Sequence, residues 1–176
     1  MQKGFDTMNI QFEDIMNYHC PRWNELPSIE LYIDQVISIL ENNLSIFNKD
    51  SDSPLITSSM INNYVKQHIL KPPVKKKYNR SHLSYLFVIC IFKRLMSLSQ
   101  IRGSITMTRR LFSVEEGYNM FCEQFEKALK NAFAPETNPP VLIEPDDVQE
   151  IAALKAIVKS FANIVLADRI ISFREI

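Results

Sequence analysis

Three consecutive lysines, Lys75, Lys76 and Lys77, are followed closely by Tyr78 and Arg80, and this basic segment holds the side chains best suited to a binding function. Ammonium and guanidinium groups bind phosphate, and the tyrosine hydroxyl can donate a further hydrogen bond to it. A lysine triplet alone is usually no more than a solvated surface turn. The segment therefore indicates nucleic-acid binding only if the residues around it support that interpretation.

The charges around this segment have one sign. Residues 53–114 carry eleven lysines and arginines and no carboxylate, although the 176-residue chain has twenty basic and twenty acidic residues and no net charge. Residues 1–52 have three bases and nine acids, and residues 115–176 have six bases and eleven acids. An uninterrupted positive field attracts polyanions, so we expect contact with double-stranded DNA. If four to six cations neutralise phosphates, the log–log salt slope should be roughly −4 to −5.

A helix with one polar face precedes the basic segment. Thr57 is a good N-cap for it, and Lys71-Pro72-Pro73 ends it because proline cannot continue a helix. The polar face has hydrogen-bonding groups and no acid, and we expect Asn62, Asn63 and Lys66 to enter a major groove. The basic segment would hold the DNA backbone. The predicted DNA-binding residues are Ser58, Asn62, Asn63, Lys66, Lys75, Lys76, Lys77, Tyr78 and Arg80.

Hydrophobic periodicity and capping signals predict six helices and a mainly all-α fold. The first helix begins at Ser28, and the fifth follows a capping box that starts at Ser113. The third, from Ser81 to about Leu95 with Asn79 or Ser81 as its cap, is apolar on nearly every side in its middle. We therefore expect it to be the central core helix.

The elements group into three parts. We predict an N-terminal arm (1–27), a helix-turn-helix DNA-binding-like domain (28–112) and a C-terminal helical region (113–176) for dimerisation and effector control. Four prolines within residues 135–145 indicate an extended linker between the helices 113–131 and 146–167. The last helix has so much apolar surface that it is either buried on two sides or buried on one side and dimerises with the other. A homodimer is expected because one motif contacts few bases and two-fold pairing is the common remedy.

Residues 59–72 resemble the recognition-helix segment of the MerR family of winged helix-turn-helix regulators, whose pattern reads S-x-L-R-Y-Y-x-x-x-G-L-L-x-P. Residues 78–83 and 97–101 are similar to the starts of the third and fourth helices of that family. The resemblance implies a MerR-like helix-turn-helix core with a very short wing. Two departures stand out: Asn62 replaces a DNA-contacting arginine, and His68 replaces a glycine in a left-handed turn.

A second resemblance spans most of the chain. Pro21-Arg22-Trp23, the segments 61–66 and 75–78, and the Leu26-Pro27 pair are similar to a bacterial family catalogued as a domain of unknown function, family 1836. The resemblance implies the same MerR-like helical fold and supplies no established activity.

Enzyme and metal chemistry are not expected. The three glycines build no phosphate-binding loop, and no HExxH or GxSxG motif occurs. The acidic pairs Glu115/Glu116 and Asp146/Asp147 lie at predicted helix starts, where they favour the helix dipole. Three distant cysteines without a CxxC motif do not form a zinc site, and Cys90 is expected to be a buried thiol. We predict no catalytic residue, cofactor or metal.

A cytoplasmic location without a membrane segment is expected, because no signal peptide is recognisable and the longest apolar run, residues 85–92, is too short to cross a bilayer. The main functional hypothesis is a DNA-binding transcriptional regulator whose effector is unknown. One alternative is a protein-interaction module whose basic face binds an acidic protein. Another is a small-molecule sensor that does not bind DNA and has a pocket among the C-terminal aromatic residues.

Overall fold

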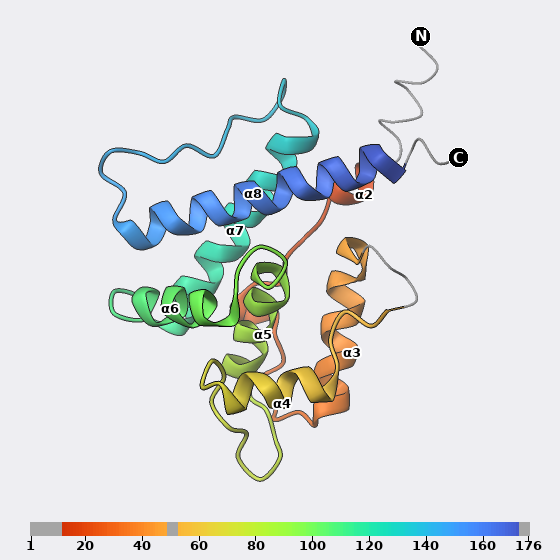
Figure 1. Ribbon diagram of the computed structural model, residues 1–176, viewed down its shortest axis with the longest axis vertical. Helices are drawn as coiled ribbons and strands as arrows, with labels where there is room; N and C mark the ends of the chain where they lie inside the picture. The colour runs from red at the N-terminus through yellow and green to blue at the C-terminus, as the bar shows by residue number, and fades with distance from the viewer. Residues whose placement is uncertain (1–11, 49–52, 173–176) are drawn as a thin grey trace. The chain divides into compact units, whose positions relative to one another are not determined.

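The computed structural model describes residues 12–48 and 53–172 (Figure 1). The fold is all-α apart from two isolated β-bridges among the described residues, which confirms the predicted class. The chain forms two compact units: a central unit of residues 21–122, and a terminal unit of residues 1–20 and 123–176. The predicted boundaries after residues 27 and 112 stay a prediction, and residues 1–11 of the predicted arm lie outside the described residues.

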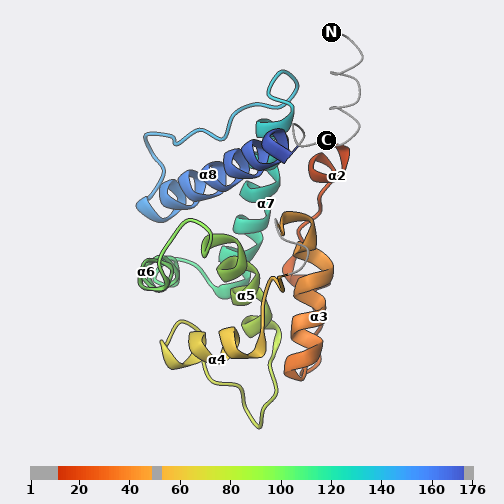
Figure 2. The same ribbon diagram turned by 45° about the vertical axis from the view of Figure 1, so that its right-hand side comes forward.

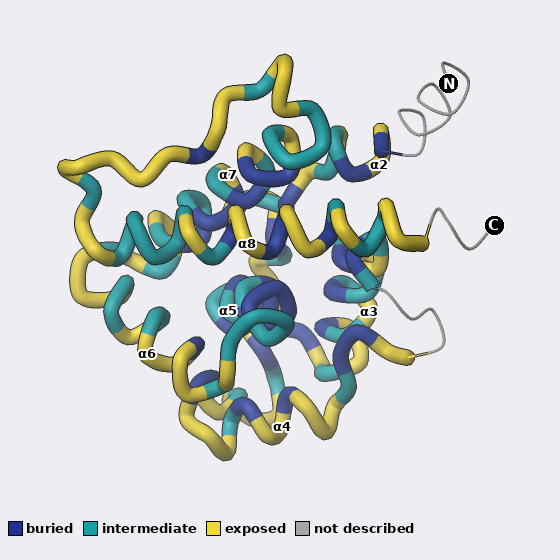
Figure 3. Tube along the Cα trace, turned by 45° about the horizontal axis from the view of Figure 1, so that its top comes forward, coloured by how far each residue is buried: buried dark blue, intermediate teal, exposed yellow. Residues whose placement is uncertain are grey.

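The central unit holds most of the elements. Its helices are η1 (Trp23–Glu25), α3 (Ile33–Leu44), η2 (Ser45–Phe47), α4 (Ser58–Lys66), α5 (Arg80–Phe92) and α6 (Leu98–Thr108), and α7 (Val114–Phe133) begins in this unit. The helices α3, α4 and α6 lie around α5, which Figure 3 shows in dark blue and nearly end-on.

Helix α5 is the core of the central unit, as predicted. Nine of its thirteen residues are buried, and Phe87 at its middle is fully buried. Cys90 is a buried free thiol, and burial raises its pKa to about 12, so it stays protonated and unreactive at neutral pH. Asn79, not Ser81, caps the helix, and the helix ends at Phe92, before the predicted Leu95.

The capping signals place most helix starts correctly. Thr57 accepts the expected cap hydrogen bond, and the Ser113 capping box forms with the Glu116 side chain. Ser97, which was not predicted as a cap, accepts the corresponding bond at the start of α6. The start of α3 is different from the prediction. The helix begins at Ile33, not at Ser28, because the backbone of Leu31 pairs with a distant segment of the chain.

The terminal unit contains α2 (Glu13–Met16), residues 123–133 of α7, and α8 (Gln149–Ser172). Its core includes the rings of Phe125 and Phe161, whose centroids are 5.4 Å apart. The predicted linker is confirmed, since residues 134–148 are not helical. Helix α8 begins three residues later than predicted, and Asp147 before it binds Lys155 at 2.6 Å. No helix in the described ranges is both long and apolar enough to cross a membrane.

Candidate nucleic-acid interface

The polar face of α4 forms where the sequence predicts it. The Thr57 hydroxyl accepts a hydrogen bond from the Met60 N–H at 3.2 Å, and Ile61 and Tyr64 bury the opposite face. All four predicted α4 site residues are exposed, namely Ser58, Asn62, Asn63 and Lys66. The Gln67 amide donates to Asn63 Oδ1 at 3.3 Å, whereas the Asn62 amide makes no hydrogen bond to another described residue.

The end of α4 is a Schellman motif, in which the chain reverses through one left-handed residue. His68 is that residue, with φ of 57°. Its N–H donates to the Val65 carbonyl at 3.0 Å, and the Ile69 N–H donates to the Tyr64 carbonyl, also at 3.0 Å. The expectation of a left-handed histidine is thus confirmed. The turn buries Ile69 and Leu70 and directs the chain away from the helix axis.

The basic segment is a two-residue β-hairpin formed by residues 74–77, here called the basic hairpin. Its ends exchange two backbone hydrogen bonds: the Lys77 N–H donates to the Val74 carbonyl at 2.9 Å, and the Val74 N–H donates to the Lys77 carbonyl at 3.2 Å. Lys75 and Lys76 form the turn with φ of 49° and 63°. Two consecutive positive φ values define a type I′ turn, which strongly favours Asn-Gly.

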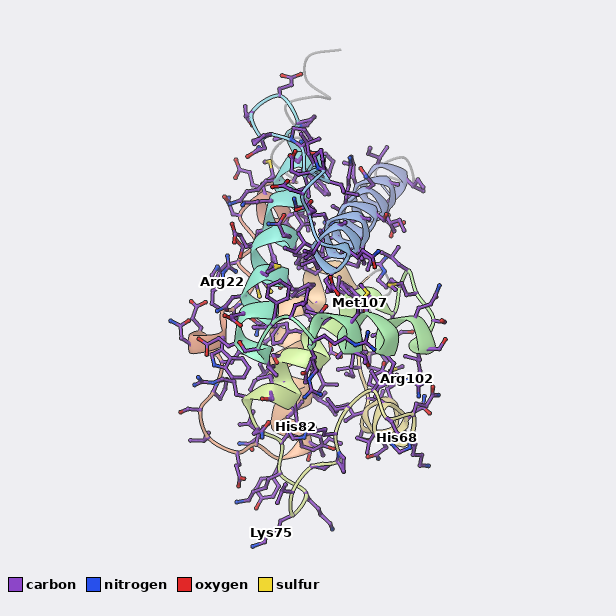
Figure 4. The ribbon with its side chains drawn as sticks, turned by 90° about the vertical axis from the view of Figure 1, so that its left-hand side faces the viewer. Arg22, His68, Lys75, His82, Arg102 and Met107 are labelled. Carbon is purple, nitrogen blue, oxygen red and sulfur yellow. The ribbon has the colours of Figure 1, made fainter. Side chains whose placement is uncertain are left out.

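The lysines of this turn are exposed, and neither forms an ion pair within the part of the chain that the structure describes. The basic hairpin projects beyond α4 in Figures 1 and 2, and Figure 4 places Lys75 at its far end. A left-handed conformation costs a lysine about 1 kcal/mol or more. The turn therefore has two lysines in a strained backbone conformation, at positions where asparagine and glycine fit better.

The base of the basic hairpin is a β-bridge to the segment before α3. The N–H groups of Leu31 and Tyr78 donate to each other's carbonyls at 2.8 Å. The Tyr78 ring is 3% exposed and packs edge-on against His82 at 5.5 Å. This burial corrects the expectation that Tyr78 lies on the phosphate-binding surface, because its place in the bridge directs the side chain into the core.

The other two predicted cations of the segment have partners in the protein. Lys77 lies 3.6 Å from Glu30 and above the Tyr32 ring. The Arg80 guanidinium lies 5.5 Å from the centre of the Trp23 ring, and its Nε donates to the Pro27 carbonyl at 3.5 Å. Both are half-exposed, so we expect them to contribute less than Lys75 and Lys76 to the positive electrostatic field of this segment.

The remaining cations of the acid-free segment divide into two groups. Lys93 and Arg94 turn inward, where they donate to the carbonyls of Leu55 and Phe47. A second group is exposed and was not among the predicted site residues: Lys71, Arg102, Arg109 and Arg110. All four lie in the acid-free segment, so the charge pattern could have identified them. They are absent from the predicted site because the prediction concentrated on the lysine triplet.

His82 lies in the first turn of α5 and completes the cap of that helix. Its N–H donates to Asn79 Oδ1 at 3.2 Å, and its Nδ1 lies 3.1 Å from the Asn79 backbone nitrogen. Burial lowers the pKa of His82, and the nearby carbonyls of Pro72 and Lys71 only partly offset this effect. The Nδ1 atom also lies 2.7 Å from Asn79 Oδ1, so whether it accepts from the N–H or donates to the oxygen depends on the tautomer, and burial is the cause of the lowered pKa.

The pH dependence of stability should follow from this lowered pKa. Between pH 7.5 and 5.5 the unfolded chain binds a proton at His82 before the folded protein does, so the free energy of unfolding should fall as pH falls. Urea unfolding at the two pH values measures the change. His82→Gln should remove most of it, whereas His68→Gln, at an exposed position, should leave it in place. Equal pH dependence in both variants would contradict the assignment.

No three histidine, cysteine or carboxylate side chains lie close enough to hold a metal ion within residues 12–48 and 53–172. The structure thus brings the α4 residues and the basic hairpin together as exposed groups of one unit, and it places Tyr78 elsewhere. The arrangement can bind an extended anion.

No curated protein and no solved structure matches this chain. A family described as a domain of unknown function (DUF1836) matches residues 21–128. The match begins where the central unit begins and includes both α4 and the basic hairpin. Because it covers more than half of the sequence, the chain belongs to the DUF1836 family.

Proposed function

We propose that this protein is a sequence-specific DNA-binding transcriptional regulator with a MerR-like winged helix-turn-helix core, in which α4 contacts bases and the basic hairpin is a short wing on the DNA backbone. The conformation of Lys75 and Lys76 is the observation that carries the proposal. Strained backbone conformations that persist where better-suited residues exist are typical of functional sites. The ammonium groups of Lys75 and Lys76 are exposed at a protruding turn and form no ion pair with another described residue, which suits a phosphate backbone.

Helix α4 supports the same function. Its exposed face offers the free amide of Asn62, and an asparagine amide can form two hydrogen bonds with adenine in the major groove. Lys66 lies one turn further along the same helix. Asparagine and lysine can both act on DNA here because no carboxylate lies in the segment to repel phosphate.

A homodimer is part of this proposal, because two recognition helices reach two half-sites. Helix α8 offers a surface for it. Ile164 and Ile171, seven residues apart and hence on one helix face, are 38% and 59% exposed. The proposed function involves no catalytic step, and we propose that the protein acts in the cytoplasm.

Fluorescence anisotropy with a labelled random duplex at low salt tests the DNA contact. The triple variant Lys75→Ala, Lys76→Ala, Lys77→Ala should bind at least about tenfold more weakly, with a log–log salt slope flatter by roughly 2 to 3. The double variant Lys127→Ala, Lys130→Ala, from exposed positions outside the acid-free segment, is the matched control and should bind like the wild type.

Selection of bound fragments from a genomic library adds a test of sequence preference. Asn62→Ala should change the selected sequence more than it changes the affinity for random duplex. Wild-type protein that ignores DNA but associates with itself or with an acidic protein at low salt would contradict the proposal and favour the protein-interaction module.

A further inference from the structure

The central unit contains a cavity of about 440 Å³ whose walls come from three elements. The turn after α4 supplies His68 to Pro72, α5 supplies Tyr85, and α6 supplies residues between Arg102 and Thr106, together with the two arginines after it. Figure 4 shows His68 and Arg102 on the same side of the unit. A volume of this size is typical of sites for small molecules.

The polar lining of this cavity is entirely basic or neutral. Five basic side chains line it: His68, Lys71, Arg102, Arg109 and Arg110. No carboxylate lines it, and residues 53–114 contain none that could approach from the same segment. Four permanent positive charges around one small space repel each other, so a bound anion would relieve an existing electrostatic cost.

Tyr85 lines the same cavity and has a hydroxyl whose hydrogen-bonding capacity is unused within the described part of the chain. Its hydroxyl oxygen is buried and has no hydrogen-bond partner among the described residues. Buried hydroxyls in native proteins are almost always satisfied, so this one calls for an explanation. Burial raises the pKa of Tyr85, while nearby Arg109 acts in the opposite direction, and the phenol remains a donor at neutral pH.

The apolar part of the lining separates this cavity from a flat phosphate-binding surface. Pro72 is exposed and Ile105 is half-buried, so these two side chains supply most of the apolar wall, whereas Ile69 and Leu70 are nearly fully buried. A DNA backbone phosphate carries no apolar body to fill such a wall. A small molecule that combines a charged group with an apolar one satisfies both halves of the lining.

We propose that this cavity binds a small phosphate monoester with an apolar body, with the arginines and Lys71 around the phosphate and the Tyr85 hydroxyl donating to it. Arginine forks match phosphate geometry, and a dianion suits four permanent positive charges better than a carboxylate does. The site shares no residue with the predicted DNA-binding set, so it can exist whether or not the protein binds DNA.

Isothermal titration calorimetry of the 176-residue protein with phenyl phosphate tests the site. The wild type should bind saturably. Arg109→Gln should weaken binding about tenfold or more, and Tyr85→Phe, which keeps the ring and removes the donor, should weaken it several-fold. Lys159→Gln, which removes an exposed cation that lines neither the cavity nor the predicted DNA-binding surface, is the control and should not change the affinity. Inorganic phosphate should bind more weakly than phenyl phosphate because it lacks the apolar body.

Two results would overturn the proposal. One is the absence of saturable binding, or equal affinity in the wild type and both cavity variants with unchanged circular dichroism. The other is loss of phenyl phosphate binding when duplex DNA is added, combined with weaker DNA binding by Arg109→Gln, which would assign the cavity to a DNA phosphate. Retained phenyl phosphate binding by Lys75→Ala, Lys76→Ala would separate this site from the proposed DNA surface.

Discussion

The double variant Lys75→Asn, Lys76→Gly is expected to be more stable than the wild type and a weaker DNA binder. Both wild-type residues have positive φ in a type I′ turn, and Asn-Gly is the favoured pair for that conformation. Relief of the backbone strain should raise the free energy of unfolding by about 1–2 kcal/mol. Loss of two exposed charges should lower the affinity for random duplex about tenfold at low salt and flatten its salt slope by roughly 2.

Urea unfolding and fluorescence anisotropy on the same preparations measure the two effects. The variant Lys75→Arg, Lys76→Arg keeps both charges and the strained turn, so it should match the wild type in stability and DNA affinity. A more stable Asn-Gly variant with undiminished DNA affinity would show that the lysines do not contact DNA. General damage to the fold would lower both stability and DNA binding, so a gain in stability with a loss of binding would point to the lysine charges themselves.

The largest expected effect on stability is that of Phe87→Ala. Phe87 is fully buried in the middle of α5, and its ring lies 6.1 Å from that of Tyr118 in the same unit. Replacing a phenylalanine in a close-packed core removes its burial energy and leaves a cavity, at a cost of about 3–5 kcal/mol. Since domains are stable by only about 5–15 kcal/mol, the variant should be near the limit of folding.

Chemical unfolding of the protein, monitored by circular dichroism, checks this prediction. The adjacent Val88 is half-buried on the same helix, so Val88→Ala should cost far less and serves as the matched control. Equal losses for Phe87→Ala and Val88→Ala would mean that α5 is not the centre of the core.

Local chemistry explains which parts of the fold were predictable. Thr57, Asn79 and Ser97 cap the helices that follow them because the side-chain oxygen of each lies within reach of a free N–H. Helix α5 was identified as the core because an apolar surface on all sides must be buried. The exposed face of α4 was predicted for the complementary reason, because its side chains are polar and gain nothing from burial.

Contacts between distant residues explain what could not be predicted. The bridge between Leu31 and Tyr78 delays the start of α3 and buries Tyr78, and nothing in either local sequence reveals it. The left-handed lysines follow from hairpin geometry, against the local preference of lysine itself. The basic cavity was missed because Arg102 and Arg109 line one cavity with His68 only in the folded chain, although more than thirty residues separate them from it in the sequence.

The Leu31–Tyr78 bridge closes the intervening chain, with α3 and α4 inside it, into a loop joined at its base by two hydrogen bonds. Such a closure fixes both ends of the enclosed segment at one point, so the two-residue turn cannot swing freely as an isolated hairpin would. The turn with Lys75 and Lys76 is thereby joined, through Tyr78, to the segment just before α3. A displacement of Tyr78 at the base of the turn would therefore also displace Leu31, two residues before α3 begins.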